Sequence, residues 1–353
     1  MSLEKRILVA PLNWGLGHAT RCIPIIKELI NNDFDPIIGS DGSALALLRK
    51  EFPSLESVEL PSYNVNYSKK AKYFKFKLIS NLPSIAIAIK NENKFVHEFI
   101  KSHNINGIIS DNRLGLYNKQ VPSAIITHQL NVLSGRTTWI STKLHQKLIN
   151  KFDECWVPDF KGTNNLSGVL GHLKSNVITT KYIGPLSRFN KTEAAIKYDL
   201  MVLLSGPEPQ RSLLEKKLLS ELKHYSGKVI FVKGKIASEQ KKEVNGNLEI
   251  YNYMTSQELE NTINESELIL SRSGYTTIMD LHKLKKKAYF IPTPGQYEQT
   301  YLAKKLKKDN VAPYCLQEAF NIEKLKEAKL YNGFGNTENY VDYDKLFSFF
   351  KRE

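Results

Sequence analysis

The chain has few cysteines and no long hydrophobic run. Its three cysteines among 353 residues are far apart and form no C-x-x-C pair, so neither a disulfide framework nor a zinc site is indicated. No segment has the roughly 20 apolar residues that a membrane-spanning helix needs, and the N-terminus leads directly into a strand-like run instead of a signal peptide. We therefore expect a protein that stays in the cytoplasm.

Acidic residues are also scarce relative to basic ones. The chain has 50 lysines and arginines against 36 aspartates and glutamates, a formal net charge of +14. This excess predicts attraction to an anion, whether nucleic acid, an acidic membrane surface or a phosphorylated substrate. The length exceeds what one ordinary core accommodates, so we expect two domains.

One basic stretch stands apart from the other lysine runs. Lys69–Ile89 interleaves lysines with aromatic residues and continues into an interrupted apolar run. Such a segment could lie on an anionic membrane, at the inner face of the cytoplasmic membrane, or form an ordinary core-facing helix with a lysine rim. Both interpretations stay open.

Apolar runs alternate with helical patterns in both halves of the chain. This alternation predicts an α/β protein made of two Rossmann-like, doubly wound domains, with ligands in a cleft between the carboxyl edges of their sheets. We expect a first domain over 1–185, a linker over 186–198, a second domain over 199–335, and a terminal helix within 336–353 that could pack back on the first domain.

The first strand is followed by a glycine loop, Gly15-Leu16-Gly17-His18. Thr20 stands where a dinucleotide fingerprint requires a third glycine, and no Gly-Lys-Ser/Thr follows, so neither a nicotinamide site nor a Walker A site is indicated. The positive end of the following helix disfavours imidazolium. His18 is therefore a candidate general base, although a structural histidine fits the same position.

Two polar clusters follow later strands of the first half. Asp111 and Asn112 end one strand, and His128, Gln129 and Asn131 follow the next. Because carboxyl ends of parallel strands share one edge of a sheet, these residues are candidate ligand contacts, although each could equally form a turn or a cap. No metal site is predicted.

The second half contains a layout typical of a nucleotide diphosphate site. Ser271–Thr277 reads as a strand end, a glycine turn and a helix start, where backbone N–H groups can hold an anion. Asp280 lies one to two turns into that helix and could accept hydrogen bonds from a ribose. Plain helix capping remains the alternative for the turn itself.

Together these motifs resemble the GT-B glycosyltransferases, and within them the MurG type, which transfers N-acetylglucosamine from its UDP derivative to a lipid-linked acceptor. The resemblance implies acceptor-side residues and donor-side residues, respectively Gly15, Gly17, Asn112, His128, Gln129 and Asn131, and Ser205, Gly206, Arg272, Ser273, Gly274, Asp280, Glu298, Gln299 and Thr300. The chain departs from the family at the Ser205–Glu208 loop, where Gly-Gly-Ser is expected, and at Asp280 and Thr300, which replace Glu and Gln.

The resemblance implies transfer of a sugar from a UDP-sugar to an acceptor hydroxyl, with inversion and without a metal or further cofactor. His18, or alternatively Asp111, would be the catalytic base, and the acceptor would be a saccharide or a lipid-linked molecule. The loop and Arg21 are also similar to UDP-sugar hydrolases of nonulosonic acid biosynthesis. A nucleic-acid-binding protein that uses Lys69–Lys77 is a further alternative, but no nucleic-acid motif is present and none is expected as a partner.

Overall fold

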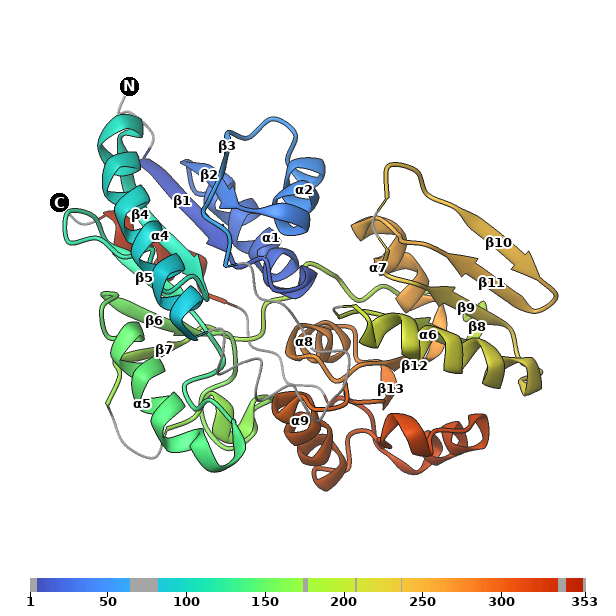
Figure 1. Cartoon of the computed structure of the whole chain (residues 1–353). Coiled ribbons are helices and arrows are strands. Elements are labelled where there is room, and N and C mark those ends of the chain that lie inside the picture. Colours follow the sequence, from blue (N-terminus) through green and yellow to red (C-terminus); the bar gives the residue numbers. More distant parts are fainter. Residues whose placement is uncertain are drawn as a thin grey trace. The chain divides into compact units, whose positions relative to one another are not determined.

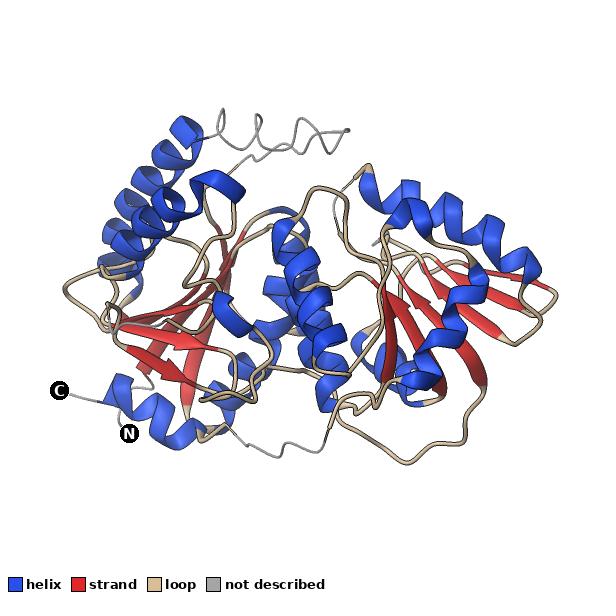
Figure 2. Cartoon of the chain, turned by 90° about the horizontal axis from the view of Figure 1, so that it is seen from below, coloured by secondary structure: helices blue, strands red, loops and turns tan. Residues whose placement is uncertain are grey.

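The computed structural model describes residues 5–63, 82–173, 177–206, 208–235, 237–335 and 341–351. These residues divide into two compact units. The first unit contains the described residues up to 186 together with 341–351, and the second contains those from 187 to 335. Each unit is built on its own sheet, with helices on both faces of the strands (Figure 1, Figure 2).

The first unit contains a parallel sheet of seven strands in the order β3-β2-β1-β4-β5-β6-β7. Five of these strands follow the predicted apolar runs, whereas β3 and β7 were not predicted. The bounds are β1 Lys5–Pro11, β2 Phe34–Ser40, β3 Ser57–Glu59, β4 Ile105–Asp111, β5 Ser123–Ile126, β6 Glu154–Val157 and β7 Thr180–Tyr182.

The helices of the first unit connect these strands. They are α1 Leu16–Asn31, α2 Gly42–Glu51, α4 Leu82–His103, α5 Thr138–Ile149 and α10 Tyr343–Lys351. Helix α1 begins at Leu16, so His18 lies inside its first turn. Strands β1 and β4 are neighbours, while the strand that follows β1 pairs on its other side. This is the topological switch point at which doubly wound sheets bind ligands.

The C-terminal helix α10, red in Figure 1, belongs to the first unit although it ends the chain. Phe347 and Phe350 are buried, and both rings pack edge-on against Phe34 of β2 at centroid distances of 5.9 and 6.5 Å. Phe350 also packs edge-on against Trp156 at 6.0 Å. Burying such aromatic rings contributes on the order of 2 kcal/mol each, so the terminal helix closes the core of this unit.

The second unit has a sheet of six strands in the order β10-β11-β9-β8-β12-β13. All pairs are parallel except β10–β11, an antiparallel hairpin that was not predicted. The strands are β8 Tyr198–Leu203, β9 Val229–Val232, β10 Lys242–Asn245, β11 Leu248–Tyr251, β12 Ser266–Ser271 and β13 Lys287–Phe290. The α-helices are α6 Gln210–Glu221, α7 Ser256–Asn264, α8 Tyr275–Lys283 and α9 Tyr297–Lys308.

The segment expected as a linker runs along the second unit. The Asn190 amide donates to Glu260 at 2.7 Å, and the Lys197 amide donates to the Glu265 carbonyl at 2.8 Å. Strand β8 then starts at Tyr198. The two doubly wound sheets confirm the predicted fold class.

The basic segment Lys69–Ile89 lies mostly outside the described residues, which resume at residue 82 in α4. Among the described helices, none combines the length and apolarity needed to cross a bilayer.

Candidate active site

The β1–α1 loop places His18 at the carboxyl edge of the first sheet. Gly15 precedes α1 with φ of 84°, a conformation that favours glycine, and its N-cap position carries no side-chain cap. His18 Nδ1 lies 2.8 Å from Oδ1 of Asp111, the last residue of β4. Its Nε2 makes no hydrogen bond within the described part of the chain, and the side chain is 16% exposed. One ring nitrogen is therefore held and the other is available.

Arg21 completes this cluster, and it was not among the predicted site residues. It is three residues after His18 on α1, a spacing that puts both side chains on one helix face. Its Nε and Nη2 donate to the two oxygens of Asp111 in a bidentate pair, and both partners are buried. Arg21 Nη2 also lies 2.9 Å from His18 Nδ1. The G-L-G-H-x-x-R pattern was the available signal.

The electrostatics of the cluster give Asp111 and His18 different protonation states. Although burial opposes ionisation of Asp111, Arg21 and then His18 lower its pKa to about 2. Burial, and next the charge of Arg21, lower the pKa of His18 below its ordinary value of 6.5. At neutral pH His18 is therefore uncharged and Asp111 is ionised. Arg21 contacts both oxygens of Asp111 and His18 Nδ1 lies beside Oδ1, while the alternative role of Asp111 as the base stays a prediction.

The other predicted acceptor residues lie near this edge but differ in accessibility. His128 is buried, with Nδ1 3.3 Å from Arg21 Nη1. The Asn131 amide donates to the Val169 carbonyl, and its backbone N–H donates to the Leu170 carbonyl at 2.9 Å.

Gln129 is half-buried. Asn112 follows Asp111 with φ of 60° and is half-buried. Gly17 lies in α1, where its carbonyl accepts from Thr20 Oγ1 at 3.1 Å.

His145 of α5 was also missed by the sequence analysis. Burial, which is the largest cause, together with the neighbouring His128 lowers its pKa to about 4. Its Nε2 is buried and has no hydrogen-bond partner within the described residues. The sequence around His145, with lysines at 143 and 147 and a glutamine at 146, does not distinguish it from a helix-surface histidine.

In the second unit, β12 ends in the turn that opens α8. Gly274 is the N-cap residue, α8 has no side-chain cap, and its first turn contains no acidic residue. A Cβ atom on Gly274 would meet only Thr277 Oγ1, at 4.0 Å, so the space beside this backbone is open. Ser273 is buried, and its hydroxyl donates to the Gln299 carbonyl at 2.8 Å. An anion can approach the helix N-terminus here.

Arg272 does not face this turn, contrary to the expectation that it would lie near the diphosphate. Its side chain is 1% exposed. Its guanidinium donates to the carbonyls of Ile291, Pro292 and Gln210 at 3.0–3.1 Å and to Gln317 Oε1 at 2.8 Å. Buried polar groups are held by such partners, so Arg272 fixes the loops around the turn from inside.

Asp280 lies on α8 with a half-buried carboxyl group. Its Oδ1 accepts from the Ser187 hydroxyl at 2.6 Å, whereas Oδ2 has no hydrogen bond within the described part of the chain. Burial raises the pKa of Asp280 to about 6, and Arg188 and Ser187 offset part of this rise. The carboxylate that forms above this pH has one oxygen left for a ligand.

The loop after β13 is shaped by residues that were predicted to contact the donor. Gln299 Oε1 accepts from the Thr293 backbone N–H at 2.8 Å, and Thr300 Oγ1 donates to the Gln296 carbonyl at 3.0 Å. Glu298 is half-buried in the first turn of α9. Gln299 and Thr300 therefore stabilise this loop through their own hydrogen bonds. Gln299 still has its amide NH₂ group available for a ligand.

The β8–α6 loop contains Ser205 and Gly206, both exposed. Glu208, at the end of the Ser205–Glu208 loop, pairs with Arg211 and accepts from the Ser212 hydroxyl at 3.0 Å and the Ser212 amide at 3.3 Å. Its carboxylate thus occupies the N-terminus of α6. Helices α6 and α8 both begin at this edge of the sheet. The N-terminus of α6 is contacted by the Glu208 carboxylate, whereas the first turn of α8 contains no acidic residue.

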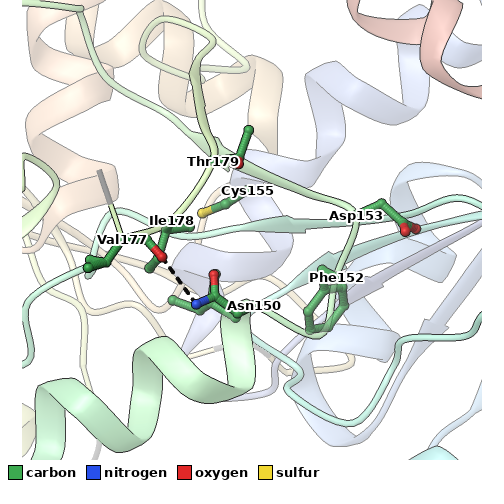
Figure 3. Close-up of a pocket in the computed structure, with 8 residues that line it drawn as sticks. Asn150, Phe152, Asp153, Cys155, Val177, Ile178 and Thr179 are labelled. Atoms are coloured by element: carbon green, nitrogen blue, oxygen red, sulfur yellow. Dashed lines mark hydrogen bonds between the residues drawn. The ribbon is translucent and has the colours of Figure 1, made fainter. Parts of the chain in front are cut away.

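A pocket of about 290 Å³ lies elsewhere, at the amino end of β6. Asn150, Phe152, Asp153, Cys155 and Val177 are among its lining residues, and Asn150 donates to the Val177 carbonyl at 3.2 Å (Figure 3). It is at the opposite edge of the sheet from His18. Over the described residues, no group of three or more histidines, cysteines and carboxylates is arranged to hold a metal ion.

Comparison with known proteins agrees with this geometry. Residues 207–345 match the model of the glycosyltransferase family 28 C-terminal domain. The whole chain is 22% identical over 362 aligned positions to a UDP-N-acetylglucosamine–N-acetylmuramyl-(pentapeptide) pyrophosphoryl-undecaprenol N-acetylglucosamine transferase of Buchnera aphidicola subsp. Schizaphis graminum, covering 98% of this chain and 94% of that protein.

Solved structures share the fold at low identity. A kitacinnamycin glycosyltransferase superposes with a TM-score of 0.64 at 12% identity, covering 99% of this chain and 95% of that one. MurG of Acinetobacter baumannii gives 0.57 at 11%, covering 99% and 100%. LpCGTa, solved with UDP, gives 0.62 at 10%, covering 99% and 100%.

The two doubly wound units share the fold of the solved GT-B glycosyltransferases, and the matches support a UDP-sugar glycosyltransferase. More particularly, residues 207–345 form a glycosyltransferase family 28 C-terminal domain, and the full chain is similar to transferases of the MurG type. The hydrolase and nucleic-acid-binding alternatives are not favoured by these matches.

Proposed function

We propose that the chain transfers N-acetylglucosamine or a closely related sugar from its UDP derivative to a hydroxyl group of a saccharide or lipid-linked acceptor. The observation that carries this proposal is the His18–Asp111 contact of 2.8 Å, with Nε2 of His18 uncommitted within the described residues. The donor sugar is suggested by the printed activity of the Buchnera relative.

In this proposal His18 is the general base. Nδ1 lies beside the ionised Asp111, which accepts, and beside Arg21 Nη2, which donates; in this proposal Nδ1 carries the proton and donates to Asp111. The lone pair then lies on Nε2, which takes the proton of the attacking hydroxyl. Arg21 neutralises the buried carboxylate and keeps His18 uncharged before the reaction.

The second unit would hold the donor. The open N-terminus of α8 beside Gly274 suits the diphosphate, because its helix dipole and backbone N–H groups favour negative charge there. Asp280 Oδ2 suits a ribose hydroxyl. The same N–H groups would stabilise the charge that develops on the leaving UDP. We further propose that no divalent ion is needed and that direct displacement inverts the anomeric carbon.

The test is release of UDP from purified protein with chelator present, over a panel of UDP-sugars, with and without saccharide acceptors. The proposal expects release from UDP-N-acetylglucosamine that increases at least tenfold with an acceptor. Release that no acceptor accelerates would instead indicate a hydrolase. Failure to release UDP from any donor would contradict both activities.

We also propose that the first unit contacts an anionic membrane. The described part of the predicted segment includes Ile87 of α4, which is 61% exposed. Helix α5 adds Trp139, Ile140 and Leu144, all more than half exposed, with exposed lysines at 143 and 147 on the same helix. Apolar side chains beside lysines are typical of interfacial helices.

Vesicle sedimentation tests this contact. Binding to vesicles with 30% phosphatidylglycerol should fall severalfold when Trp139 and Leu144 are both replaced by Ser, and 0.5 M salt should weaken it as well, because lysine attraction is screened. Substituting Val169 and Val177 by Ser is the control, since these exposed valines are outside α5. Equal binding by both variants would contradict a role for α5.

A further inference from the structure

The segment that follows β5 begins beside the catalytic cluster. His128 Nδ1 lies 3.3 Å from Arg21 Nη1, and Arg21 Nη2 lies 2.9 Å from His18 Nδ1. Residues 129–132 come next and form neither helix nor strand. We call them the acceptor segment, because the family resemblance assigns two of their side chains to the acceptor. Without a sheet or a helix around them, their backbone N–H and C=O groups need partners from elsewhere.

Helix α5 supplies two of these partners. The Val132 N–H donates to Thr142 Oγ1 at 3.0 Å, and Gln146 Nε2 donates to the Leu130 carbonyl at 3.1 Å. Thr142 and Gln146 are four residues apart, so both side chains lie on one face of the helix. Both residues are half-buried, whereas Lys143 between them is exposed. One face of α5 is therefore hydrogen-bonded to the backbone of the acceptor segment.

His145 supplies a third partner from the same face of α5, three residues after Thr142. Its ring donates to the Gln129 carbonyl. Since Nε2 has no hydrogen-bond partner within the part of the chain that the structure describes, the donor is Nδ1. Burial, the largest cause, lowers the pKa of His145 to about 4, so the ring is neutral at neutral pH. The contact with Gln129 thus needs only the Nδ1 proton.

The other side of the acceptor segment is held by the chain at residues 169–170. The Asn131 N–H donates to the Leu170 carbonyl at 2.9 Å, and the Asn131 side-chain NH₂ group donates to the Val169 carbonyl. These bonds fix which end of the Asn131 amide faces the protein. Its Oδ1 makes no hydrogen bond within the described residues, and an amide oxygen accepts from O–H and N–H groups. The segment therefore presents one oriented acceptor atom.

We propose that Thr142, His145 and Gln146 are positioning residues for the acceptor substrate, because they hold the backbone of the acceptor segment from the side of α5. Through that backbone they keep Asn131 Oδ1 in place for an O–H or N–H group of the saccharide. This inference rests on the proposed transferase function. It predicts that loss of these side chains raises the acceptor KM and leaves kcat and UDP affinity unchanged, since α5 contains neither the base nor the donor site.

Kinetics of Thr142 variants with a soluble saccharide acceptor test this role. Thr142→Val keeps the shape of the side chain but removes the oxygen that accepts from Val132. The acceptor KM should rise roughly fivefold, the net value of one hydrogen bond, with kcat and calorimetric UDP affinity within twofold. Thr142→Ser should restore the wild-type KM. An unchanged acceptor KM in Thr142→Val would refute the assignment.

Asn150→Ala is the matched control for these variants. It removes a hydrogen bond from the C-terminal end of the same helix, donated to the Val177 carbonyl at 3.2 Å. This bond does not involve the acceptor segment, so the acceptor KM should stay at the wild-type value. A rise equal to that of Thr142→Val would mean that general loosening of α5 causes both effects, which would also reject the proposal.

Two substitutions of His145 separate the roles of its ring nitrogens. The NH₂ group of asparagine can replace the Nδ1 donor but not the Nε2 lone pair. His145→Asn should therefore keep the acceptor KM within twofold of the wild type, whereas His145→Leu should raise it roughly fivefold. Gln146→Leu should resemble His145→Leu. If His145→Asn is as impaired as His145→Leu, His145 acts through Nε2, and its assignment as a positioning residue is overturned.

Amide hydrogen exchange tests the hydrogen bonds of α5 without turnover. The Val132 N–H loses its acceptor in Thr142→Val and should exchange severalfold faster than in the wild type, while Asn150→Ala leaves its rate unchanged. Equal exchange in Thr142→Val and the wild type would overturn the proposal whatever the activity of the protein. Faster exchange in Thr142→Val, in a protein whose wild type transfers no sugar to any acceptor, would instead contradict the proposed function.

Discussion

The β1–α1 edge of the first unit and the β12–α8 edge of the second unit both lie at carboxyl ends of parallel strands, yet they are built differently. In the first unit, the β1–α1 loop lies over buried salt bridges, Arg21 with Asp111 and Arg113 with Glu92 and Asp41. In the second unit, the edge around α8 has an open helix N-terminus without a first-turn acid. Fixed charges orient a proton acceptor in one case, and backbone dipoles receive an anion in the other.

His18→Ala should produce the largest effect, because it removes the base from one edge and leaves the other untouched. We expect a loss of roughly 10²–10⁴-fold in kcat, measured by UDP release, with UDP affinity unchanged by calorimetry. Since the pKa of His18 is below 6.5, the wild-type rate should hold down to that pH and fall in more acidic solution. Retained turnover in the variant would remove His18 from the mechanism.

Asp111→Asn should rank next, with a loss of roughly 10²-fold in kcat. An amide can donate to Nδ1 and so favour the tautomer whose proton is on Nε2, where the base is needed. Arg21 also loses its charged partner, so we expect a lower melting temperature. Asn112→Ala is the matched control, because it leaves the ion pair in place. If Asp111→Asn keeps wild-type kcat, the tautomer assignment fails.

Asp280→Asn should weaken UDP binding about tenfold, through loss of a charged hydrogen-bond acceptor. The same substitution should stabilise the folded protein at neutral pH, although it weakens UDP binding. The native carboxyl holds its proton up to about pH 6, so this contribution is complete below about pH 4 and lost as pH rises through 6. At pH 7.5 the variant should gain up to about 3 kcal/mol of unfolding free energy. If the difference in unfolding free energy between the variant and the wild type is the same at pH 7.5 as at pH 4, the raised pKa of Asp280 is contradicted.

Glu208→Gln should have the smallest effect and would sharpen the contrast between α6 and α8. Removing the carboxylate from the N-terminus of α6 reduces repulsion toward a nearby diphosphate, so UDP affinity should rise two- to threefold at low salt. Glu221→Gln, at the other end of α6, is the control. A fall in affinity would mean that Glu208 contacts the donor directly.

Much of the fold could be predicted because its central strands are apolar runs between glycine turns. The missed strands lack that signal, since β3 and β7 contain no fully buried residue and β10 is exposed throughout. The β10–β11 hairpin did have a local signal, the Asn245-Gly246 turn.

The candidate site was less accessible to sequence reasoning. Carboxyl ends of strands could be predicted, which placed His18 and Asp111 at one edge, but their pairing across 93 residues depends on β1 and β4 being neighbours. Arg272 was placed on the donor side, near the diphosphate, because of the family resemblance at Arg272-Ser273-Gly274. The structure buries it among backbone carbonyls instead.

Isothermal calorimetry of the purified protein against UDP, ADP, GDP and dTDP, with chelator present, tests the central claim most directly. A UDP-sugar transferase whose second unit holds the nucleotide through backbone N–H groups and Asp280 predicts selective binding of UDP without metal. Absence of binding, or equal binding of all four nucleotides, would contradict the account.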